Sequence, residues 1–537
     1  MTSVDKMSYN EIMDTYAKQI QAVELDAFRV ADTAITWEEF LGQPGKEHYK
    51  FLSWAASKFK GRCIFDIGTH RGASALALAS GSEHNTVYSF DLEHKYPLPK
   101  PANVEYSTDN LMTEEGRAKW EEKLLGSAFI FLDIDPHEGA REYEFYQWLK
   151  SKAYKGFVIC DDIWFFKEMR DNFWYKIPGA EKVDLTRLGH WSGTGIVRFD
   201  SSTELWPAAL SERADNWTVV TAYFDLTKMP DASISIKARP AEHYLASARA
   251  TMSTEQNLVV FCEPESVATL QAMRPAWLLE KHTKFVPMSF EDFPLTQYRA
   301  KIQQNRQEKP YNFDDRNTAS YYLLCMARYA MLKRVMEENP FGSTHFAWLN
   351  ICIERMGWRN VAALESVWRQ NRDKFSTCYI DYQPEHLVRN MPEYFKWGRC
   401  SMCSGFFTGR ADYFKRFCDA IEEKFMLALE AGYGHADEQL FSMVYFDNRD
   451  IFEVYYGDYR EMVTNYVEPV DRSFEPVRLL IAHSAAAGDN LVAERGCEAL
   501  WNGWKKGTVE FSDNQLRELM RTYRIVRQRL GKGTALP

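Results

Sequence analysis

Carboxylates follow several short apolar runs in the first 200 residues, at places where the chain turns. Asp66 lies in CIFDIG, Asp91 ends TVYSFD, and Asp109 lies in YSTDN. In an open α/β sheet, ligands bind outside the carboxyl ends of the strands, so these acids are expected on one rim. A carboxylate there can accept hydrogen bonds from a ribose diol, a role predicted for Asp91, while Asp109 is placed to face an adenine edge.

A glycine-containing turn follows the first of these runs. Gly68 and Gly72 separate it from a segment rich in alanine and leucine, within DIGTHRGAS (66–74). Glycine lets the backbone approach a ligand closely, because it has no Cβ. The spacing differs from the GxGxxG of dinucleotide-binding loops, so a single nucleoside without a pyrophosphate is the better match. A tight structural turn is the alternative interpretation.

Two further runs end in paired acids. FLDID contains Asp133 and Asp135, and VICDDIW contains Asp161 and Asp162. Carboxylates that converge on one rim repel each other unless a cation lies among them. Oxygen ligands suit Mg²⁺, Ca²⁺ or Mn²⁺, and such an ion lowers the pKa of a bound hydroxyl. The pattern therefore predicts a divalent cation, with Mg²⁺ or Mn²⁺ expected, among three or four of these carboxylates.

A histidine lies next to these acids in the sequence. His137 comes two residues after Asp135 and is the candidate general base for removing a proton from a substrate hydroxyl. His70 and His190 are weaker candidates. A hydrogen-bonded structural role is the alternative for each of the three.

Strands and helices must alternate to bring these residues together. The runs expected as strands in the first half are CIFDIG, TVYSFDLE, NVEYSTD, AFIFLDID, GFVICDD and GTGIVRFD. Amphipathic segments such as EGAREYEFYQWLKSK fit the crossover helices of a mostly parallel, doubly wound sheet. A second series begins with WTVVTAYFDL and NLVVFCEPE, after a segment (200–216) that looks like a linker.

Length and composition frame this organisation. A chain of 537 residues is too long for one ordinary core. We expect two α/β domains, 1–210 with a helical lead-in that includes Trp37 to Leu41, and 211–537 with a C-terminal helical extension. The last helix is expected to be capped by Ser512 or Asp513.

Charge and apolar content exclude some classes of function. The formal net charge is −10, which repels phosphate backbones and argues against a nucleic-acid partner. No apolar stretch reaches the roughly 18 residues of a membrane-spanning helix. The ten scattered cysteines suit reduced thiols, and the N-terminus does not look like a secretory signal, so a cytoplasmic location is expected.

The first half resembles the class I S-adenosylmethionine-dependent methyltransferases, over about residues 45–200. The matching stretches are DIGTHRGAS (66–74), the strand end at Asp91, and FLDIDPHEG (131–139). The resemblance implies a seven-stranded Rossmann-like sheet and S-adenosyl-L-methionine as cofactor. The cofactor-binding residues that it implies are Asp66, Gly68, Thr69, Gly72, Ser74, Asp91, Asp109 and Asp133.

The acid pairs look like those of the metal-dependent O-methyltransferases of the catechol and caffeoyl type. There, an Asp after the fourth strand and an Asp-Asn pair after the fifth hold the metal. By position, Asp133 and Asp161 match the two acids, and Asp162 replaces the Asn. The lysine that this family has near the position of His137 is missing.

The second half resembles the HtrL/YibB-type proteins, which look like GT-A glycosyltransferases, over about residues 215–490. The matching stretches are NPFGSTHFAWLNICIERMG, CSGFFTGRADYFKRF, GYGHADEQLFSMVYFDNRD and RLLIAHSAAAGDN. The resemblance implies a nucleotide-sugar as donor substrate. The donor-binding residues that it implies are Thr221, Tyr223, Asp225, Asn350, Gly405 and His483.

One of these positions departs from the GT-A pattern. Asn350 stands where an acid that binds a metal–diphosphate is expected, and Cys352 follows two residues later. Either a metal is held more weakly, with help from Glu354 or His483, or no metal is needed. Asp437 and Glu438 are the candidates to deprotonate or orient the acceptor hydroxyl, and a helix-capping role is the alternative.

Together these features predict a bifunctional enzyme that modifies a glycan or glycolipid. The C-terminal domain would transfer a sugar, and the N-terminal domain would methylate a sugar hydroxyl. The alternative is a methyltransferase with a non-catalytic, sugar-binding C-terminal module, favoured by Asn350. A nucleic-acid-modifying enzyme is a third hypothesis, against which the net charge argues.

Overall fold

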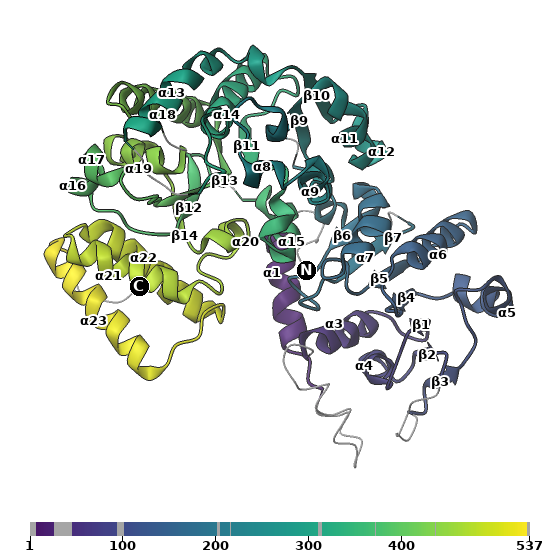
Figure 1. Ribbon diagram of the computed structural model, residues 1–537. Helices are drawn as coiled ribbons and strands as arrows, with labels where there is room; N and C mark the ends of the chain where they lie inside the picture. The colour runs from purple at the N-terminus through teal and green to yellow at the C-terminus, as the bar shows by residue number, and fades with distance from the viewer. Residues whose placement is uncertain are drawn as a thin grey trace. The chain divides into compact units, whose positions relative to one another are not determined.

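The computed structural model describes residues 7–25, 46–93, 101–200, 205–214, 216–309, 314–370, 372–434 and 437–533. The chain divides into two compact units, Met1–Arg213 and Ala214–Pro537 (Figure 1). Each unit contains a seven-stranded sheet with helices around it. The expected fold class, two α/β domains in tandem, is confirmed. The expected helical turn at Trp37 to Leu41 lies outside the described residues.

The sheet of the first unit has the strand order β3-β2-β1-β4-β5-β7-β6. Strand β7 runs antiparallel to both of its neighbours, and the other pairs are parallel. All six expected strands are present, and β6, only three residues long, was not predicted from the sequence. The strands are β1 (Cys63–Ile67), β2 (Thr86–Phe90), β3 (Val104–Ser107), β4 (Phe129–Leu132), β5 (Phe157–Cys160), β6 (Lys182–Asp184) and β7 (Gly195–Arg198).

Helices cover both faces of this sheet because its central strands are apolar on both sides. Ile64 of β1 faces the cluster formed with the helices at the N-terminus, and the next residue, Phe65, packs against Trp120 on the opposite face. The helices are α1 (Tyr9–Gln21), α3 (Lys46–Ser57), α4 (Ala73–Gly81), α5 (Glu114–Leu125), α6 (Ala140–Ser151) and α7 (Lys167–Asn172).

The segment after β7, expected as a linker, packs into the first unit. Trp206 is fully buried, and its ring contacts those of Tyr16, Trp54 and Phe157. The hydroxyl of Tyr16 also donates a hydrogen bond of 2.7 Å to the carbonyl of Leu205. The described part of this segment therefore contributes to the core instead of spanning solvent.

The register of the parallel strands brings the rim residues into one row. Ile67 of β1 pairs with Phe90 of β2 and with Leu132 of β4, which in turn pairs with Cys160 of β5. The residues that follow these four are Gly68, Asp91, Asp133 and Asp161. The carboxyl ends of four neighbouring strands thus present three carboxylates and one glycine side by side.

Gly68 is required at its place in this row. Its φ is +94°, and a Cβ there would lie 1.7 Å from the carbonyl oxygen of Asp133. The β1–α4 turn therefore passes directly against the end of β4. The contact fixes the distance between the glycine turn and the acids of the rim.

We predict that Gly68→Ala destabilises the first unit by about 2–4 kcal/mol, because it combines backbone strain with a clash against backbone atoms. Gly61→Ala is the matched control, since Gly61 also has a positive φ, +68°, but a Cβ there would meet no described residue within 4 Å beyond its two chain neighbours. We expect it to cost about 1 kcal/mol. Denaturation of the full chain, followed by hydrogen exchange in β1 and β4, measures the difference. Equal losses in the two variants would contradict the steric explanation.

The sheet of the second unit has the order β10-β9-β8-β11-β13-β12-β14. Strand β13 is antiparallel to both of its neighbours, and the remaining pairs are parallel. The strands are β8 (Trp217–Tyr223), β9 (Asn257–Cys262), β10 (Thr283–Pro287), β11 (His345–Leu349), β12 (Ser376–Tyr379), β13 (Met402–Arg410) and β14 (Tyr455–Tyr456).

Long helices bury one large core of this unit. α14, α18 and α19 pack on the central strands, through a cluster rich in phenylalanine and tyrosine. The longer helices are α13 (Arg299–Glu308), α14 (Ala319–Glu338), α15 (Trp358–Val367), α18 (Ala411–Glu430), α19 (Asp437–Asp447), α21 (Phe474–Ala486), α22 (Asn490–Lys506) and α23 (Asp513–Arg529). The shorter ones are α8 (Ile234–Lys237), α9 (Ala241–Leu245), α10 (Arg249–Met252), α11 (Val267–Met273), α12 (Ala276–Leu279), α16 (Glu385–Val388), α17 (Met391–Tyr394) and α20 (Thr464–Val467).

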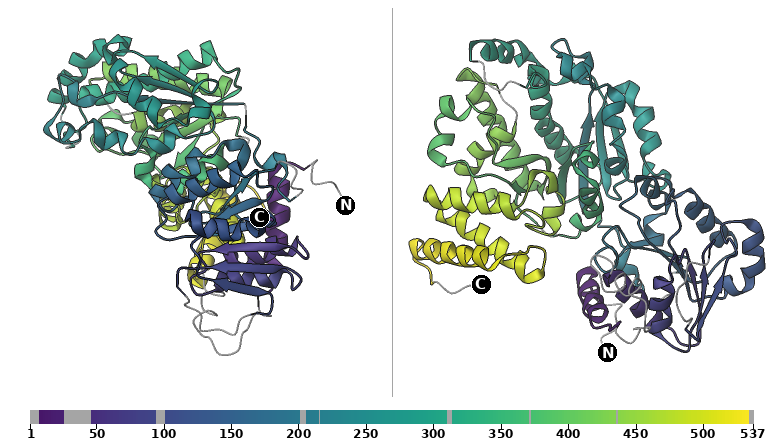
Figure 2. Two further views of the ribbon diagram at one scale, coloured as in Figure 1. Left: turned by 90° about the vertical axis from the view of Figure 1, so that its right-hand side faces the viewer. Right: turned by 60° about the horizontal axis from the view of Figure 1, so that its bottom comes forward.

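The last three helices pack side by side at the end of the chain (Figure 2). Ser512 caps α23, accepting a hydrogen bond from the Gln515 amide, as predicted. Leu519, Tyr523 and Val526 form its buried stripe. Within the described ranges, no helix combines the length and the apolar character needed to cross a membrane.

Candidate functional site

The rim of the first unit begins with two carboxylates of different character. Asp66 is fully buried and accepts a hydrogen bond of 2.8 Å from Ser89 Oγ, and its Oδ1 has no partner among the described residues. Burial raises the pKa of Asp66 to about 6. Asp91 is only half-buried and accepts hydrogen bonds from the backbone amides of His70 at 2.8 Å and Glu93 at 3.3 Å. Each of its oxygens has a second lone pair, which a ligand can use.

The residues of the glycine turn lie beside these two acids. Gly72 begins α4 with a φ of +89°. Ser74 Oγ lies 3.3 Å from Thr69 Oγ1, and both side chains are buried. Both hydroxyls lie near the carboxylate of Asp66, where burial raises its pKa and these hydroxyls act to lower it. The turn therefore surrounds Asp66 with hydroxyl groups.

Asp109, for which a contact with an adenine edge is predicted, already has hydrogen-bond partners. Its Oδ2 accepts hydrogen bonds of 2.7 Å from Lys119 Nζ and 2.8 Å from Trp120 Nε1, both on α5. These hydrogen bonds lower the pKa of Asp109 to about 2. The carboxylate is held within the first unit, so an adenine edge would have to compete with two existing donors.

A first cluster gathers Asp133, His137 and Asp162, and we call it the Asp133 cluster. One ligand atom from each of the three lies within 4.8 Å of the others. Nε2 of His137 lies 3.3 Å from Oδ2 of Asp162, and Nδ1 lies 4.0 Å from Oδ1 of Asp133. Nε2 is also 3.3 Å from Oδ1 of Asp135. The His137 ring stacks on Phe166, with centroids 4.5 Å apart, which orients the imidazole toward the acids.

The carboxylates of this cluster are electrostatically strained. Burial, and then the charges of Asp161 and Asp162, raise the pKa of Asp133 well above its ordinary value. Burial and the charge of Asp161 raise the pKa of Asp162 to about 6. A cation at this place would relieve the repulsion, and the two oxygens and one nitrogen are suitable ligands for a divalent ion.

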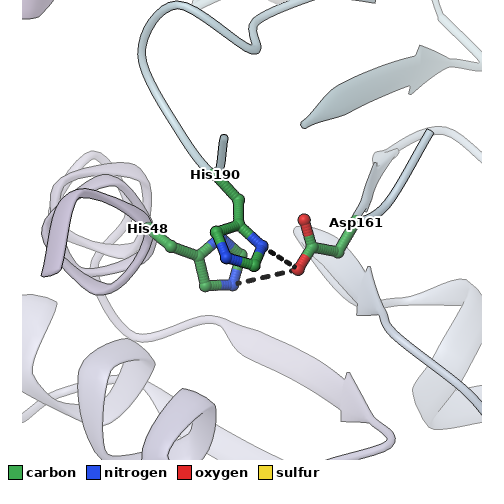
Figure 3. Close-up of side chains that lie close together, drawn as sticks. All are labelled: His48, Asp161 and His190. Carbon is green, nitrogen blue, oxygen red and sulfur yellow. Dashed lines mark hydrogen bonds and ion pairs between the residues drawn. The ribbon is translucent and has the colours of Figure 1, made fainter. Parts of the chain in front are cut away.

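A second cluster lies around Asp161 and contains His48 and His190; we call it the Asp161 cluster (Figure 3). Nδ1 of His190 lies 2.9 Å from Oδ2 of Asp161, and Nε2 of His48 lies 3.9 Å from the same oxygen. Asp161 and His48 are buried. Burial lowers the pKa of His48 to about 4. Burial acts to raise the pKa of Asp161, but the two imidazoles lower it overall.

The structure therefore divides the three acids that were expected to hold one cation. Asp133 and Asp162 face each other with His137, while Asp161 turns to His48 and His190. Asp162 has a φ of +58°, and this left-handed backbone turns the two neighbouring carboxylates to different sides. Sequence reasoning missed His48, because it lies on a helix that precedes the sheet and no spacing relates it to Asp161.

In the second unit, four of the six expected donor-binding residues, Thr221, Tyr223, Asp225 and Asn350, lie at or near the carboxyl ends of β8 and β11. Trp348 pairs with Val220, so the ends of these parallel strands are adjacent. Thr221 and Tyr223 are buried, and neither hydroxyl has a hydrogen-bond partner among the described residues. Asp225 accepts hydrogen bonds from the amide and hydroxyl of Thr227 at 3.0 and 2.6 Å. The hydroxyls of Thr221 and Tyr223 thus have more unused hydrogen-bonding capacity for a ligand than the carboxylate of Asp225.

Asn350 is fixed by its neighbours. Trp348 Nε1 donates to Asn350 Oδ1 at 2.8 Å, and the Asn350 backbone amide donates to the carbonyl of Gly405 at 2.9 Å. A Cβ at Gly405 would lie 3.0 Å from Met462 Sδ and 3.2 Å from Asn350 Nδ2, so only a small residue fits there. The Asn350 side chain thus offers its Nδ2 as a donor, a group that binds oxygen atoms instead of cations.

Asp437 forms a buried ion pair that sequence reasoning did not foresee. It is fully buried, 3.2 Å from the guanidinium of Arg328, and accepts a hydrogen bond of 2.6 Å from Tyr329 Oη. Arg328 also donates to the carbonyl of Ser404 at 2.6 Å. A lone arginine within the otherwise apolar middle of α14 was the available signal, because a charged residue is rarely buried without a partner.

Glu438, the next residue, is the more available carboxylate. It is half-buried, and its Oε1 accepts hydrogen bonds from the amide and hydroxyl of Ser404 at 3.1 and 3.2 Å. Burial and the charge of Asp437 raise the pKa of Glu438 above its ordinary value. Ser404 precedes Gly405, so Glu438 and Asn350 meet at the same stretch of β13.

His483 lies on α21 with 56% of its side chain exposed, and its Nδ1 is 3.8 Å from Oδ1 of Asp381. Asp381 follows β12 and accepts a hydrogen bond of 2.6 Å from Gln383 Nε2. His483 can therefore reach a ligand only from the solvent side of this pair.

We predict that Arg328→Met destabilises the second unit by about 3–5 kcal/mol, because it leaves the Asp437 carboxylate buried without its cation. Arg334→Met on the same helix is the matched control. Arg334 is 49% exposed and pairs with Glu338, so we expect less than about 0.5 kcal/mol. Thermal unfolding of the full chain measures both. Adding Asp437→Asn to Arg328→Met should restore part of the loss; no restoration would contradict the ion-pair explanation.

Comparison with protein families gives one match. Residues 215–466 match the model of the HtrL_YibB family, described as a bacterial protein of unknown function. The resemblance seen in the second half of the sequence is confirmed over this range. Comparison with curated proteins gave no match.

Solved structures similar to the chain fall into two groups. The cofactor-bound Rv0187 from MTB is 17% identical, with 37% of this chain and 93% of that chain covered and a TM-score of 0.22. An O-methyltransferase from Bacillus cereus, in complex with SAH, is 17% identical, with 35% and 90% covered and a TM-score of 0.22. Mouse xyloside xylosyltransferase 1 is 11% identical, with 44% and 84% covered and a TM-score of 0.25. Similarity at this level carries no argument about the fold or the activity of either unit.

Proposed function

We propose that the chain is a transferase with two activities. The first unit transfers a methyl group from S-adenosyl-L-methionine to a hydroxyl of a glycan or glycolipid, and the second transfers a sugar from a nucleotide-sugar to that acceptor. The observation that carries the proposal is the row of rim residues in the first unit. Asp91, the proposed ribose acceptor, lies two strands away from Asp133, whose cluster is proposed to activate a hydroxyl.

The residues of the rim fit S-adenosylmethionine. Asp91 has lone pairs that can accept hydrogen bonds from the ribose diol. The buried Oδ1 of Asp66 has no hydrogen-bond partner among the described residues, and a ligand or a water molecule can supply one. Gly68 brings the backbone of the turn close to the end of β4. The cofactor supplies an electrophilic methyl group when bound. The chain's own residues hold the nucleoside and set the position of the acceptor.

The Asp133 cluster fits a divalent cation. It offers two carboxylates, and a cation between them would offset the burial and the charge repulsion that raise the pKa of both groups. A bound cation supplies positive charge that favours an ionised hydroxyl. His137 is the base in this proposal, because its Nε2 points into the cluster and can take the proton of the hydroxyl.

We predict that S-adenosylhomocysteine binds the full chain and that Asp91→Asn weakens this binding by about 10- to 100-fold, through the loss of charged hydrogen bonds to the ribose. Asp14→Asn is the control, since Asp14 is 60% exposed and lies on α1. Calorimetric titration gives both affinities. Equal affinity in wild type and Asp91→Asn would remove Asp91 from the cofactor site, and no binding at all would remove the methyltransferase proposal.

In the second unit, Glu438 is the proposed base for the acceptor hydroxyl, and Asp437 is the residue that positions it. Asp437 is enclosed by Arg328 and Tyr329, whereas Glu438 is half-buried and held by Ser404. The donor's nucleoside would lie against Thr221, Tyr223 and Asp225 at the end of β8. Asn350, Gly405 and His483 are proposed to contact its sugar and diphosphate.

The second candidate function is a sugar-binding module without transfer activity. Asn350 favours it, because an amide held by Trp348 offers no negative charge to a metal–diphosphate. The full chain under this hypothesis binds a glycan or nucleotide-sugar and releases no nucleoside diphosphate. The same assay of donor turnover therefore separates the two candidates.

We predict that Glu438→Gln lowers kcat for sugar transfer by about 100-fold or more and leaves KM for the donor nearly unchanged, because the base acts in the transition state. The raised pKa of Glu438 should also move the acid limb of the wild-type pH profile above the range of an ordinary glutamate, since activity is lost as the base becomes protonated. Release of UDP or GDP from a panel of nucleotide-sugars measures both. Glu430→Gln, at the end of α18, is the matched control. A Glu438→Gln variant with the kcat of the control would show that Glu438 is not the base.

A further inference from the structure

The Asp161 cluster takes no part in the proposed methyl transfer, and its composition is that of a metal site. It contains two imidazoles and one carboxylate, which come from α3, the end of β5 and the loop before β7. In Figure 3, both imidazoles point a nitrogen at the same oxygen of Asp161. A single ion pair with Asp161 needs only one histidine, whereas two histidines face the same carboxylate oxygen here.

The distances suit a small cation among the three groups. Bonds of about 2.0–2.2 Å to a tetrahedral ion place neighbouring ligand atoms about 3.4 Å apart. The separations from Asp161 Oδ2 are 2.9 Å to His190 Nδ1 and 3.9 Å to His48 Nε2, on either side of that value. All three ligand atoms lie within 4.8 Å of one another, so small side-chain rotations are enough to surround an ion.

Burial provides a second observation. His48 and Asp161 are 5% and 4% exposed, and His48 Nδ1 and Asp161 Oδ1 are buried without a hydrogen-bond partner among the described residues. Groups of this kind cost free energy when they are left unpaired in a core. A cation bound to Asp161 Oδ2 and His48 Nε2 compensates for the charge of the buried carboxylate. His190, with a side chain 23% exposed, leaves a path by which the ion can enter.

We propose that His48, Asp161 and His190 bind a divalent first-row transition metal, with Zn²⁺ as the test ion, at a site separate from the Asp133 cluster. Two imidazoles and one carboxylate favour such a metal over Mg²⁺ or Ca²⁺, which prefer oxygen ligands. Three protein ligands leave a fourth position for water or another ligand. The bound metal ties α3 and the loop before β7 to the end of β5, and it holds Asp161 away from the Asp133 cluster.

The two clusters must be separated in the test, because both can take up a divalent ion. The background is the full chain without a polyhistidine tag, carrying Asp133→Asn and His137→Asn, which removes two of the three donors of the Asp133 cluster. After stripping with a chelator, this protein is titrated with Zn²⁺ in competition with a chromophoric chelator. We expect one equivalent of zinc, and X-ray absorption at the zinc edge should show two imidazole ligands.

Adding His190→Asn to this background should weaken zinc binding by about 100-fold or more, since even the loss of an outer-shell partner costs about 10- to 100-fold. His48→Asn should have the same effect. His84→Asn is the matched control, because His84 is 53% exposed and lies outside both clusters. Zinc should also raise the thermal stability of the background and of the His84 control, but not of the His190 variant.

Two outcomes overturn the proposal: no zinc bound at micromolar concentration by the background, or zinc binding that survives His190→Asn. In the first case, His190 and Asp161 form an ion pair with His48 packed beside it. If His48→Asn does not fold, the variant of the partly exposed His190 decides alone. Zinc binding and its ligands are read without any methyl transfer, so the result is independent of the proposed activities.

Discussion

The repulsion among carboxylates at the end of the first sheet is the constraint on which the rest of that unit depends. Parallel register places Asp91, Asp133 and Asp161 in one row, and Asp162 follows directly. Like charges so close together in a partly buried site disfavour ionisation. The chain resolves this by turning Asp161 and Asp162 to different sides, each toward a histidine. Both clusters therefore reduce the repulsion between the adjacent carboxylates Asp161 and Asp162, because each carboxylate lies next to a histidine.

The lack of a side chain at Gly68 allows the rim residues Gly68, Asp91, Asp133 and Asp161 to lie in one row. The turn at Gly68 touches the carbonyl of Asp133, so the glycine turn and the acids of the rim are separated by a single backbone contact. A side chain at position 68 would push the glycine turn away from the end of β4. The proposed methyl transfer would need the donor and the acceptor hydroxyl held in close alignment, and the contact at Gly68 would set this spacing.

The second unit handles buried charge in a different way. Its Asp437 is neutralised by Arg328 inside the core, and this pair leaves the next carboxylate, Glu438, half-buried with a raised pKa. Arg328 also holds the carbonyl of Ser404, whose amide and hydroxyl bind Glu438. One arginine on α14 therefore positions both the acid pair and the strand that carries Gly405. A buried ion pair of this kind specifies a geometry more than it adds stability.

Local patterns in the chain were enough to predict the architecture and much of the rim, but not which side chains meet. Apolar runs that end in acids indicated six of the seven strands in the first unit. These features are local, because the burial of a strand and the geometry of a turn depend mainly on residues that are close in the sequence. The strand β6 was not predicted, because three residues are too few to show an alternating pattern. The burial of Trp206 was not predicted either, because the segment around it is mostly polar. Asp161 and Asp162 are adjacent in the chain, yet one joins His48 and His190 and the other joins Asp133 and His137. Their residue types could be read directly, whereas the direction of each side chain depends on backbone torsion and on partners supplied by distant helices.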